Sequence, residues 1–223
     1  MMERITEAEL MLGEEQAKAY AHADFSNAHN LFVATLQQKF SDIPSGFNDV
    51  ILDLGCGPCD ITRRVAAAYP DAGFHGVDGS AKMLKYGAEL NDKANLAMRI
   101  KLIETCLPNP RLPQQKYHAI ISNSLLHHLH DPSTFWETIQ QHAKPFAHIF
   151  IMDLIRPLDE QTVKFLSAEY AGNEPNILKE DFENSLRAAF TIEEVQQQLD
   201  EKGLTNLTVE EVDELHMIIF GVL

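Results

Sequence analysis

Hydrophobic and polar positions follow two different patterns on either side of residue 49. In residues 3–40 apolar side chains such as Leu10, Leu36 and Phe40 recur near helical spacing, which predicts helices. The stretch "ADFSNAHN" predicts a break between two helices, and "SDIPSGFND" predicts a connector. From residue 49 onwards, short apolar runs alternate with amphipathic stretches.

The apolar runs predict five buried strands, which are "VILDLG", "FHGVDG", "RIKLI", "YHAIIS" and "HIFIMDL". Helical patterns lie between them: "DITRRVAAAYP", "AKMLKYGAEL" with Ser80 as its N-cap, and "STFWETIQQHA" with Asp131 at the cap and Pro132 at the first position. Strands that alternate with helices at this spacing predict parallel βαβ units. The fold class is therefore a doubly wound α/β sheet with helices on both faces.

The C-terminal third has a different organisation. Three helical stretches follow residue 157, and then two strands, "LTNLTVEEV" and "LHMIIFGVL", come close together and can form an antiparallel pair at one edge. We therefore expect an N-terminal helical cap over residues 1–47. A Rossmann-like domain over 48–223 would carry a helical lid insertion at about 157–203.

Charge limits the classes of partner. The net charge is −15, and residues 158–214 hold 15 acids against 4 bases. Such a surface repels nucleic acids and anionic membranes, so we expect a small-molecule or protein partner. No apolar run is long enough for a signal or a membrane span, and three cysteines leave one unpaired, which predicts a reduced, cytoplasmic protein. The sequence does not fix the oligomeric state, a homodimer being one option.

The stretch "LDLGCGPCDI" at residues 52–61 has two interpretations. Cys56 and Cys59 form a C-x-x-C pair, but a thioredoxin-type centre usually has a tryptophan just before the pair, and here Gly55 stands there. The pair is also only half of a metal site, and "HHLH" at 127–130 is the one other candidate, so we expect no metal.

The alternative is a glycine turn after a strand. Gly55 and Gly57 let the backbone turn sharply and approach a ligand, while the next helix offers unpaired N–H groups. Asp60 replaces the third glycine of the dinucleotide fingerprint, which argues against a pyrophosphate. Asp78, 21 residues beyond Gly57, is placed to accept hydrogen bonds from ribose hydroxyls. The pattern favours another nucleotide-derived cofactor.

Three segments in order carry a family resemblance. "VILDLGCGPCDI", "FHGVDGSAKML" and "YHAIISNSLLHHLHDP" resemble motifs of class I S-adenosylmethionine-dependent methyltransferases, particularly of the quinone-biosynthesis and small-molecule subgroup. The resemblance implies a seven-stranded, mostly parallel sheet with an antiparallel last strand. It also implies S-adenosylmethionine as cofactor, S-adenosylhomocysteine as product, and methyl transfer to a small-molecule acceptor.

The resemblance and the strand-end positions together suggest roles for individual residues. Cofactor contacts are expected from Asp53, Gly55, Cys56, Gly57, Asp78, Gly79, Met83, Glu104, Thr105, Asn123 and Ser124. Substrate contacts are expected from Tyr20, Phe25, His128, Asp153 and Arg156, with Arg156 holding a carboxylate. His127 would accept a proton from the acceptor, and Asn123 would orient the cofactor or the nucleophile.

Several alternatives stay open at this point. "LHHL" can be a structural turn, Arg156 can belong to a surface salt bridge, and Tyr20 and Phe25 can be core residues. Cys59 stands where the family usually has glycine, which bears on the affinity for the cofactor. The chain can also act on tRNA or protein, or bind S-adenosylmethionine without catalysis.

Overall fold

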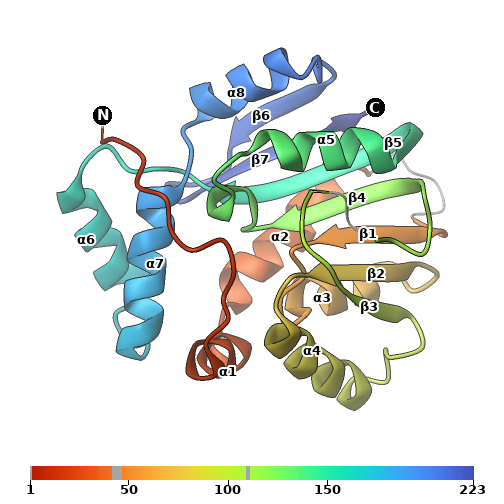
Figure 1. Ribbon diagram of the computed structural model, residues 1–223, viewed down its shortest axis with the longest axis horizontal. Helices are drawn as coiled ribbons and strands as arrows, with labels where there is room; N and C mark the ends of the chain where they lie inside the picture. Colours follow the sequence, from red (N-terminus) through yellow and green to blue (C-terminus); the bar gives the residue numbers. More distant parts are fainter. Residues whose placement is uncertain (1, 42–46, 109–110) are drawn as a thin grey trace.

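A single sheet of seven strands organises the chain. The computed structural model describes residues 2–41, 47–108 and 111–223 (Figure 1). The strands are β1 (Val50–Leu54), β2 (Gly73–Asp78), β3 (Ile100–Glu104), β4 (Tyr117–Asn123), β5 (Ala143–Leu154), β6 (Leu207–Glu211) and β7 (His216–Val222). Their order across the sheet is β3-β2-β1-β4-β5-β7-β6.

Strand direction confirms the predicted fold class. Strands β1 to β5 pair in parallel, while β7 runs antiparallel to both β5 and β6. The order reverses beside β1, where β2 and β4 lie on its two sides. In doubly wound sheets, ligands bind at this switch point, beyond the carboxyl ends of the strands.

Two apolar layers hold helices against the sheet. On one layer, Trp136 of α5 (Ser133–His142) and Leu199 of α8 (Ile192–Glu201) pack with strand residues such as Ile149. On the other, Phe32 of α2 (Ser26–Lys39) and Val65 of α3 (Asp60–Ala68) pack with residues such as Ile51. Because strand residues point alternately to opposite faces, the short apolar runs supply both layers.

The helix boundaries follow their local signals. Helix α4 (Ala81–Lys93) packs against β3, and its N-cap Ser80 accepts a hydrogen bond from the Met83 amide as predicted. Asp131 lies one residue before the assigned N-cap of α5, Pro132, and accepts from the Ser133 amide. At α8, Thr191 and Glu194 form a reciprocal capping box.

The N-terminal segment differs from the helix predicted to start at residue 3. Helix α1 spans Glu14–His22, α2 begins at Ser26, and the break between them lies at the predicted place. Residues 2–12, here called the N-terminal strap, contain no helix and lie across the molecule toward α7 (Asn176–Ala188) (Figure 1). Polar atoms of the strap bind groups that are distant in the sequence. The Arg4 side chain, for example, donates hydrogen bonds to the backbone carbonyls of Ala188, His127 and Leu129. The predicted connector falls largely on 42–46, outside the described residues.

Two of the last three helices stand apart from the sheet layers. Helix α6 (Glu160–Tyr170) and α7 pack on each other beside the carboxyl ends of the strands (Figure 1). Helix α8 instead buries Val195 and Leu199 in the core. Within the lid predicted at 157–203, therefore, only α6 and α7 are placed to cover a site. None of the described helices has the length and apolarity needed to cross a membrane.

Candidate active site

Two adjoining cavities lie at the carboxyl ends of the strands, each with a volume of about 340 Å³. The first cavity is bounded by the glycine turn after β1, the end of β2 and the N-terminal strap. The second is bounded by α2, α7 and the segment after β4. Eight residues line both cavities: Met11, Tyr20, Asp24, Phe25, His29, Asn123, Ser124 and His128. These residues are called the shared wall below.

The glycine turn opens onto the first cavity. Gly55 has φ +72°, and a Cβ there would lie 2.9 Å from the side chain of Leu125. Gly57 has φ +50°, and a Cβ there would meet no atom within 4 Å. The amides of Gly55 and Cys56 both donate to the Val77 carbonyl, at 2.8 and 2.9 Å. The turn is therefore fixed by β2, and its backbone faces open space at Gly57.

The cysteine pair belongs to this turn. Cys56 lines the first cavity, and burial raises the pKa of its thiol well above the ordinary value. Cys59 has φ 64°, which explains why glycine suits this position. Its side chain is fully buried, and a Cβ added to Gly87 of α4 would lie 3.1 Å from its sulfur. The Cys59 side chain therefore packs beneath α4 and does not obstruct the cavity.

Two carboxylates stand behind the turn. Asp78 lines the first cavity at the end of β2 and accepts hydrogen bonds from the Gly57 amide (2.9 Å) and the Ser80 amide (2.7 Å). Each oxygen keeps a further lone pair for a ligand. Asp53 also lines this cavity, and Thr62 donates to it at 2.5 Å. Burial raises the pKa of Asp53 to about 7 against the opposing hydrogen bond, and burial also raises the pKa of Asp78.

The remaining predicted cofactor residues divide into two groups. Gly79, Met83, Thr105, Asn123 and Ser124 line the first cavity with Asp53, Asp78 and the turn. Glu104 does not, because it is exposed at the end of β3, and the chain enters the cavity wall only at Thr105. The expected contact from Glu104 is therefore corrected.

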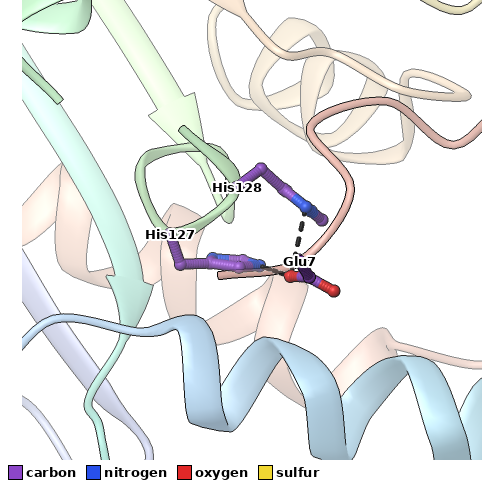
Figure 2. Close-up of side chains that lie close together, drawn as sticks. All are labelled: Glu7, His127 and His128. Atoms are coloured by element: carbon purple, nitrogen blue, oxygen red, sulfur yellow. Dashed lines mark ion pairs between the residues drawn. The ribbon is translucent and has the colours of Figure 1, made fainter. Parts of the chain in front are cut away.

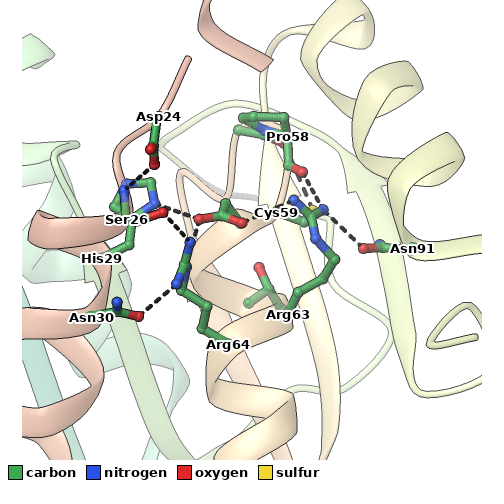
Figure 3. A network of polar contacts seen from close by, with 12 residues as sticks. Asp24, Ser26, His29, Asn30, Pro58, Cys59, Arg63, Arg64 and Asn91 are labelled. Atoms are coloured by element: carbon green, nitrogen blue, oxygen red, sulfur yellow. Dashed lines mark hydrogen bonds and ion pairs between the residues drawn. The ribbon is translucent and has the colours of Figure 1, made fainter. Parts of the chain in front are cut away.

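A network of polar contacts joins α2 to the start of α3 (Figure 3). Asp60 accepts from His29 at 2.6 Å and from Arg64 at 2.7 Å, and these contacts lower its pKa against the effect of burial. Arg63 donates to the Pro58 carbonyl at 2.6 Å. Asp60, which stands where a dinucleotide fingerprint would have glycine, thus fixes α2 to α3 beside the first cavity.

His127 is part of a buried chain of charges. Its Nδ1 donates to Asp153 at 2.6 Å, and its Nε2 lies 3.5 Å from Glu7 of the strap (Figure 2). Burial favours the neutral imidazole, but Asp153 and Glu7 outweigh it and the pKa of His127 is raised. The ring lines the second cavity, yet both nitrogens face carboxylates, so it is poorly placed as a general base. The contacts of His127 fit better with the alternative that "LHHL" is a structural turn.

His128 lies on the shared wall. Its Nδ1 is 3.2 Å from Glu7 (Figure 2), and burial, aided by the neighbouring His127, lowers the pKa of its imidazole to about 3. The neutral ring can accept a hydrogen bond, but it is a weak base. Asn123 reaches the same wall from the end of β4, where its side-chain amide donates to Ser124 at 3.1 Å.

Asp153 and Arg156 lie outside the linings of both cavities, which corrects their expected substrate roles. Asp153 is buried and accepts from His127, Leu126 and Leu154. Arg156 is buried and makes a two-pronged contact with Glu194 at 2.9 and 2.6 Å. Its guanidinium is thus unavailable to a carboxylate ligand. Tyr20 and Phe25 do reach both cavities, with ring centroids 4.8 Å apart.

The chain was compared with known protein families. A family model described as "Methyltransferase domain" matches residues 46–203, which is more than half of the chain. The chain belongs to this methyltransferase family. The match spans the glycine turn, the end of β2 and the turn after β4, the three segments that carry the sequence resemblance. The prediction of a methyltransferase enzyme is confirmed, whereas the quinone-biosynthesis subgroup is not.

Solved structures show the same fold at low sequence identity. A SAM-dependent methyltransferase from Aquifex aeolicus is 18% identical, with 95% of this chain and 99% of that chain covered and a TM-score of 0.66. The plantazolicin methyltransferase BpumL, in complex with SAH, is 15% identical over 93% of this chain and 89% of that one, with a TM-score of 0.73. The phosphoethanolamine N-methyltransferase 2 of Haemonchus contortus is 15% identical over 93% and 56%, with a TM-score of 0.66. A comparison with curated protein sequences found no match.

The candidate site also contains residues that the sequence pattern did not indicate. Glu9, Leu10 and Met11 of the strap line the first cavity, and Ser80 donates to the Met11 carbonyl at 2.8 Å. The one local signal is Gly79, where a Cβ would lie 2.6 Å from Leu10. Asp181 and Phe182 of α7 line the second cavity, and nothing local in the sequence marks them as site residues.

Proposed function

We propose that this methyltransferase binds S-adenosylmethionine in the first cavity and transfers its methyl group to a small-molecule acceptor in the second cavity. The observation that carries the proposal is the shared wall, which would place a donor in the first cavity and an acceptor in the second against the same side chains. Cavities of about 300–1,000 Å³ are typical of small-ligand sites, and each of these two falls at the lower end of that range.

The residues of the first cavity fit the donor. The backbone at Gly57 faces open space where a side chain would otherwise stand, so a ligand can approach the turn closely. Asp78 holds the turn through the Gly57 amide and has lone pairs left for two ribose hydroxyls. Asp53 is a buried carboxyl without a cationic partner among the described residues, and the ammonium group of the donor would supply one.

Bound S-adenosylmethionine supplies an electrophilic methyl group on a sulfonium sulfur. The protein then mainly has to orient an acceptor atom and exclude water. Tyr20 and Phe25 would help to exclude water, because their apolar rings line both cavities and pack on each other. His128 and Asn123 would orient the acceptor atom by hydrogen bonding. With a pKa of about 3, His128 orients the acceptor and does not retain its proton.

The other candidate functions are weaker. A net charge of −15 disfavours a nucleic-acid acceptor, because phosphate backbones require a basic surface. A protein or peptide acceptor is not favoured by any specific contact.

The test has two stages. Calorimetry with S-adenosylhomocysteine should show one site per chain, and incubation with methyl-labelled S-adenosylmethionine and a cell metabolite extract should label a small molecule. Absence of S-adenosylhomocysteine binding would overturn the proposal. Binding without any labelled product across extracts would leave the protein as a cofactor binder.

The proposed role of Asp53 predicts a pH-dependent affinity. Its carboxyl, with a pKa of about 7 caused mainly by burial, is neutral below that pH, and only the ionised form attracts an ammonium group. Affinity for S-adenosylhomocysteine should therefore rise with pH between 6 and 8, by up to about tenfold for each pH unit below the pKa. Calorimetry in two buffers of different ionisation enthalpy should show proton release. Asp53→Asn keeps the acceptor oxygen for Thr62 and should abolish both effects; an unchanged pH profile in this variant would contradict the assignment.

A further inference from the structure

The second cavity has an acidic wall. The acids among its lining residues are Asp24, Glu174, Asp181 and Asp213, and no lysine or arginine is found among the described residues that line it. A cleft lined by charge of one sign concentrates ligands of the opposite sign. The wall thus disfavours acceptors that carry carboxylate or phosphate groups.

Among the histidines that line this cavity, His216 alone faces one of its four acids, Asp213. His128 is neutral because burial lowers its pKa to about 3. His29 and His127 each face a carboxylate outside the lining, Asp60 and Asp153. His216 pairs with Asp213, so the acids of the described lining without a histidine partner are Asp24, Glu174 and Asp181.

Among the acids of the second cavity, Asp181 is a partly buried carboxylate without a lysine or arginine partner in the described part of the chain. It is half-buried on α7, and its Oδ2 accepts a hydrogen bond from the neutral amide of Gln16 at 2.9 Å. Burial, with a smaller effect from Glu180, raises the pKa of Asp181 despite that bond. Within the described part of the chain it forms no ion pair with lysine or arginine. A partly desolvated carboxylate of this kind is stabilised by a bound cation.

Aromatic side chains complete the lining. Tyr20 and Phe25 lie on the shared wall, while Phe182 and Tyr170 belong to the α6–α7 side. Ring faces attract organic cations as well as apolar groups, and the effect is stronger where water is excluded. The combination of rings and a carboxylate therefore suits an amine on an apolar or aromatic body.

We infer that the acceptor is a cationic amine whose ammonium group binds Asp181 and whose apolar body lies against the rings of the cavity. This inference rests on the proposed function, since it names the acceptor class for the same site. The ammonium group is the recognition element, and the acceptor atom for the methyl group lies toward the shared wall. Carboxylate-bearing acceptors, expected from Arg156 in the sequence, are disfavoured, because Glu194 holds that guanidinium and the described lining of the second cavity has no lysine or arginine.

The experiment uses three probes of matched shape on the full chain saturated with S-adenosylhomocysteine. Calorimetry compares 2-phenylethylamine, 2-phenylethanol and 3-phenylpropanoate. The amine should bind about tenfold more tightly than the alcohol, which is the scale of one charge-assisted contact, and the carboxylate should bind most weakly. Added salt should reduce this preference.

Two variants place the effect on one residue. Asp181→Asn keeps its contact with Gln16 and should lower the affinity for the amine about tenfold, with the affinity for the alcohol unchanged. Glu180→Gln removes the adjacent exposed acid, which does not line the cavity, and should change the three affinities much less than Asp181→Asn does, because its effect on Asp181 is small.

Equal binding of the three probes, a preference for the carboxylate, or no binding of the amine would overturn the inference. So would an Asp181→Asn protein that still prefers the amine. If S-adenosylhomocysteine itself does not bind, the proposed function fails. The affinities of the three probes measured without it then still show whether the second cavity prefers an amine.

Discussion

Replacing Asp153 with alanine is expected to lower the free energy of unfolding by about 3–5 kcal/mol at pH 6, the usual cost of removing one partner from a buried ion pair. The variant leaves the His127 imidazolium without its partner at 2.6 Å. It also leaves the amides of Leu126 and Leu154, which donate to the same carboxylate, without an acceptor. Urea denaturation followed by circular dichroism measures the change.

A double-mutant cycle shows whether the pair itself is responsible. Asp153→Ala, His127→Ala and the double variant should give a coupling energy well above that of a matched cycle on the exposed pair His118 and Asp49, which we expect below about 1 kcal/mol. Equal coupling in the two cycles would contradict the buried-pair interpretation.

The effect of the Asp153 substitution should depend on pH. The pKa of His127 is raised because its two carboxylate neighbours outweigh burial, so its contribution is complete below the unfolded value of about 6.5 and is lost as pH rises through the folded value. The pKa of Asp153 is lowered because its contact with His127 and the backbone amides outweigh burial. Its contribution is therefore present above about pH 4 and is lost as pH falls. The difference between wild type and variant should be largest between about pH 4 and 6.5.

Replacing Asp78 with alanine is expected to weaken S-adenosylhomocysteine binding by about 5–150-fold, the equivalent of 1–3 kcal/mol for hydrogen bonds to a charged group. Two effects contribute. The ribose hydroxyls lose their proposed acceptor, and the Gly57 amide, which fixes the glycine turn, loses its partner at 2.9 Å. Calorimetry measures the change.

Glu104→Gln is the matched control for Asp78. Glu104 lies beside Asp78 in the parallel register of β2 and β3, at the same edge of the sheet, but it is exposed and outside the cavity lining. Its substitution should leave the affinity unchanged. Unaltered affinity in Asp78→Ala, or an equal loss in Glu104→Gln, would remove Asp78 from the site.

Most of the fold could be predicted because its signals are local. The apolar runs and the caps at Ser80 and Asp131 act within a few residues. Parallel strands bring Asp53, Asp78 and Asn123 to one edge whatever the loops do. The glycine turn was predictable for the same reason, since the positive φ values of Gly55 and Gly57 favour glycine wherever the chain goes next.

The errors concern side chains whose partners are distant in the sequence. Asp153 and Arg156 do lie at the end of β5, but they bind His127 and Glu194, and no local sequence pattern indicates those contacts. The strap was predicted to be helical because apolar residues recur in it at helical spacing. It is extended because Arg4 and Glu7 find partners on the turn after β4 and on α7, more than 100 residues away.

The shared wall has a consequence for inhibitor design. Because Tyr20, Phe25 and His128 line both cavities, ligands bound in the two cavities would contact the same side chains and lie close to each other. A single compound with a nucleoside at one end and a protonated nitrogen at the other can therefore span both, and tethering the two halves spares the second half its separate entropic cost of association.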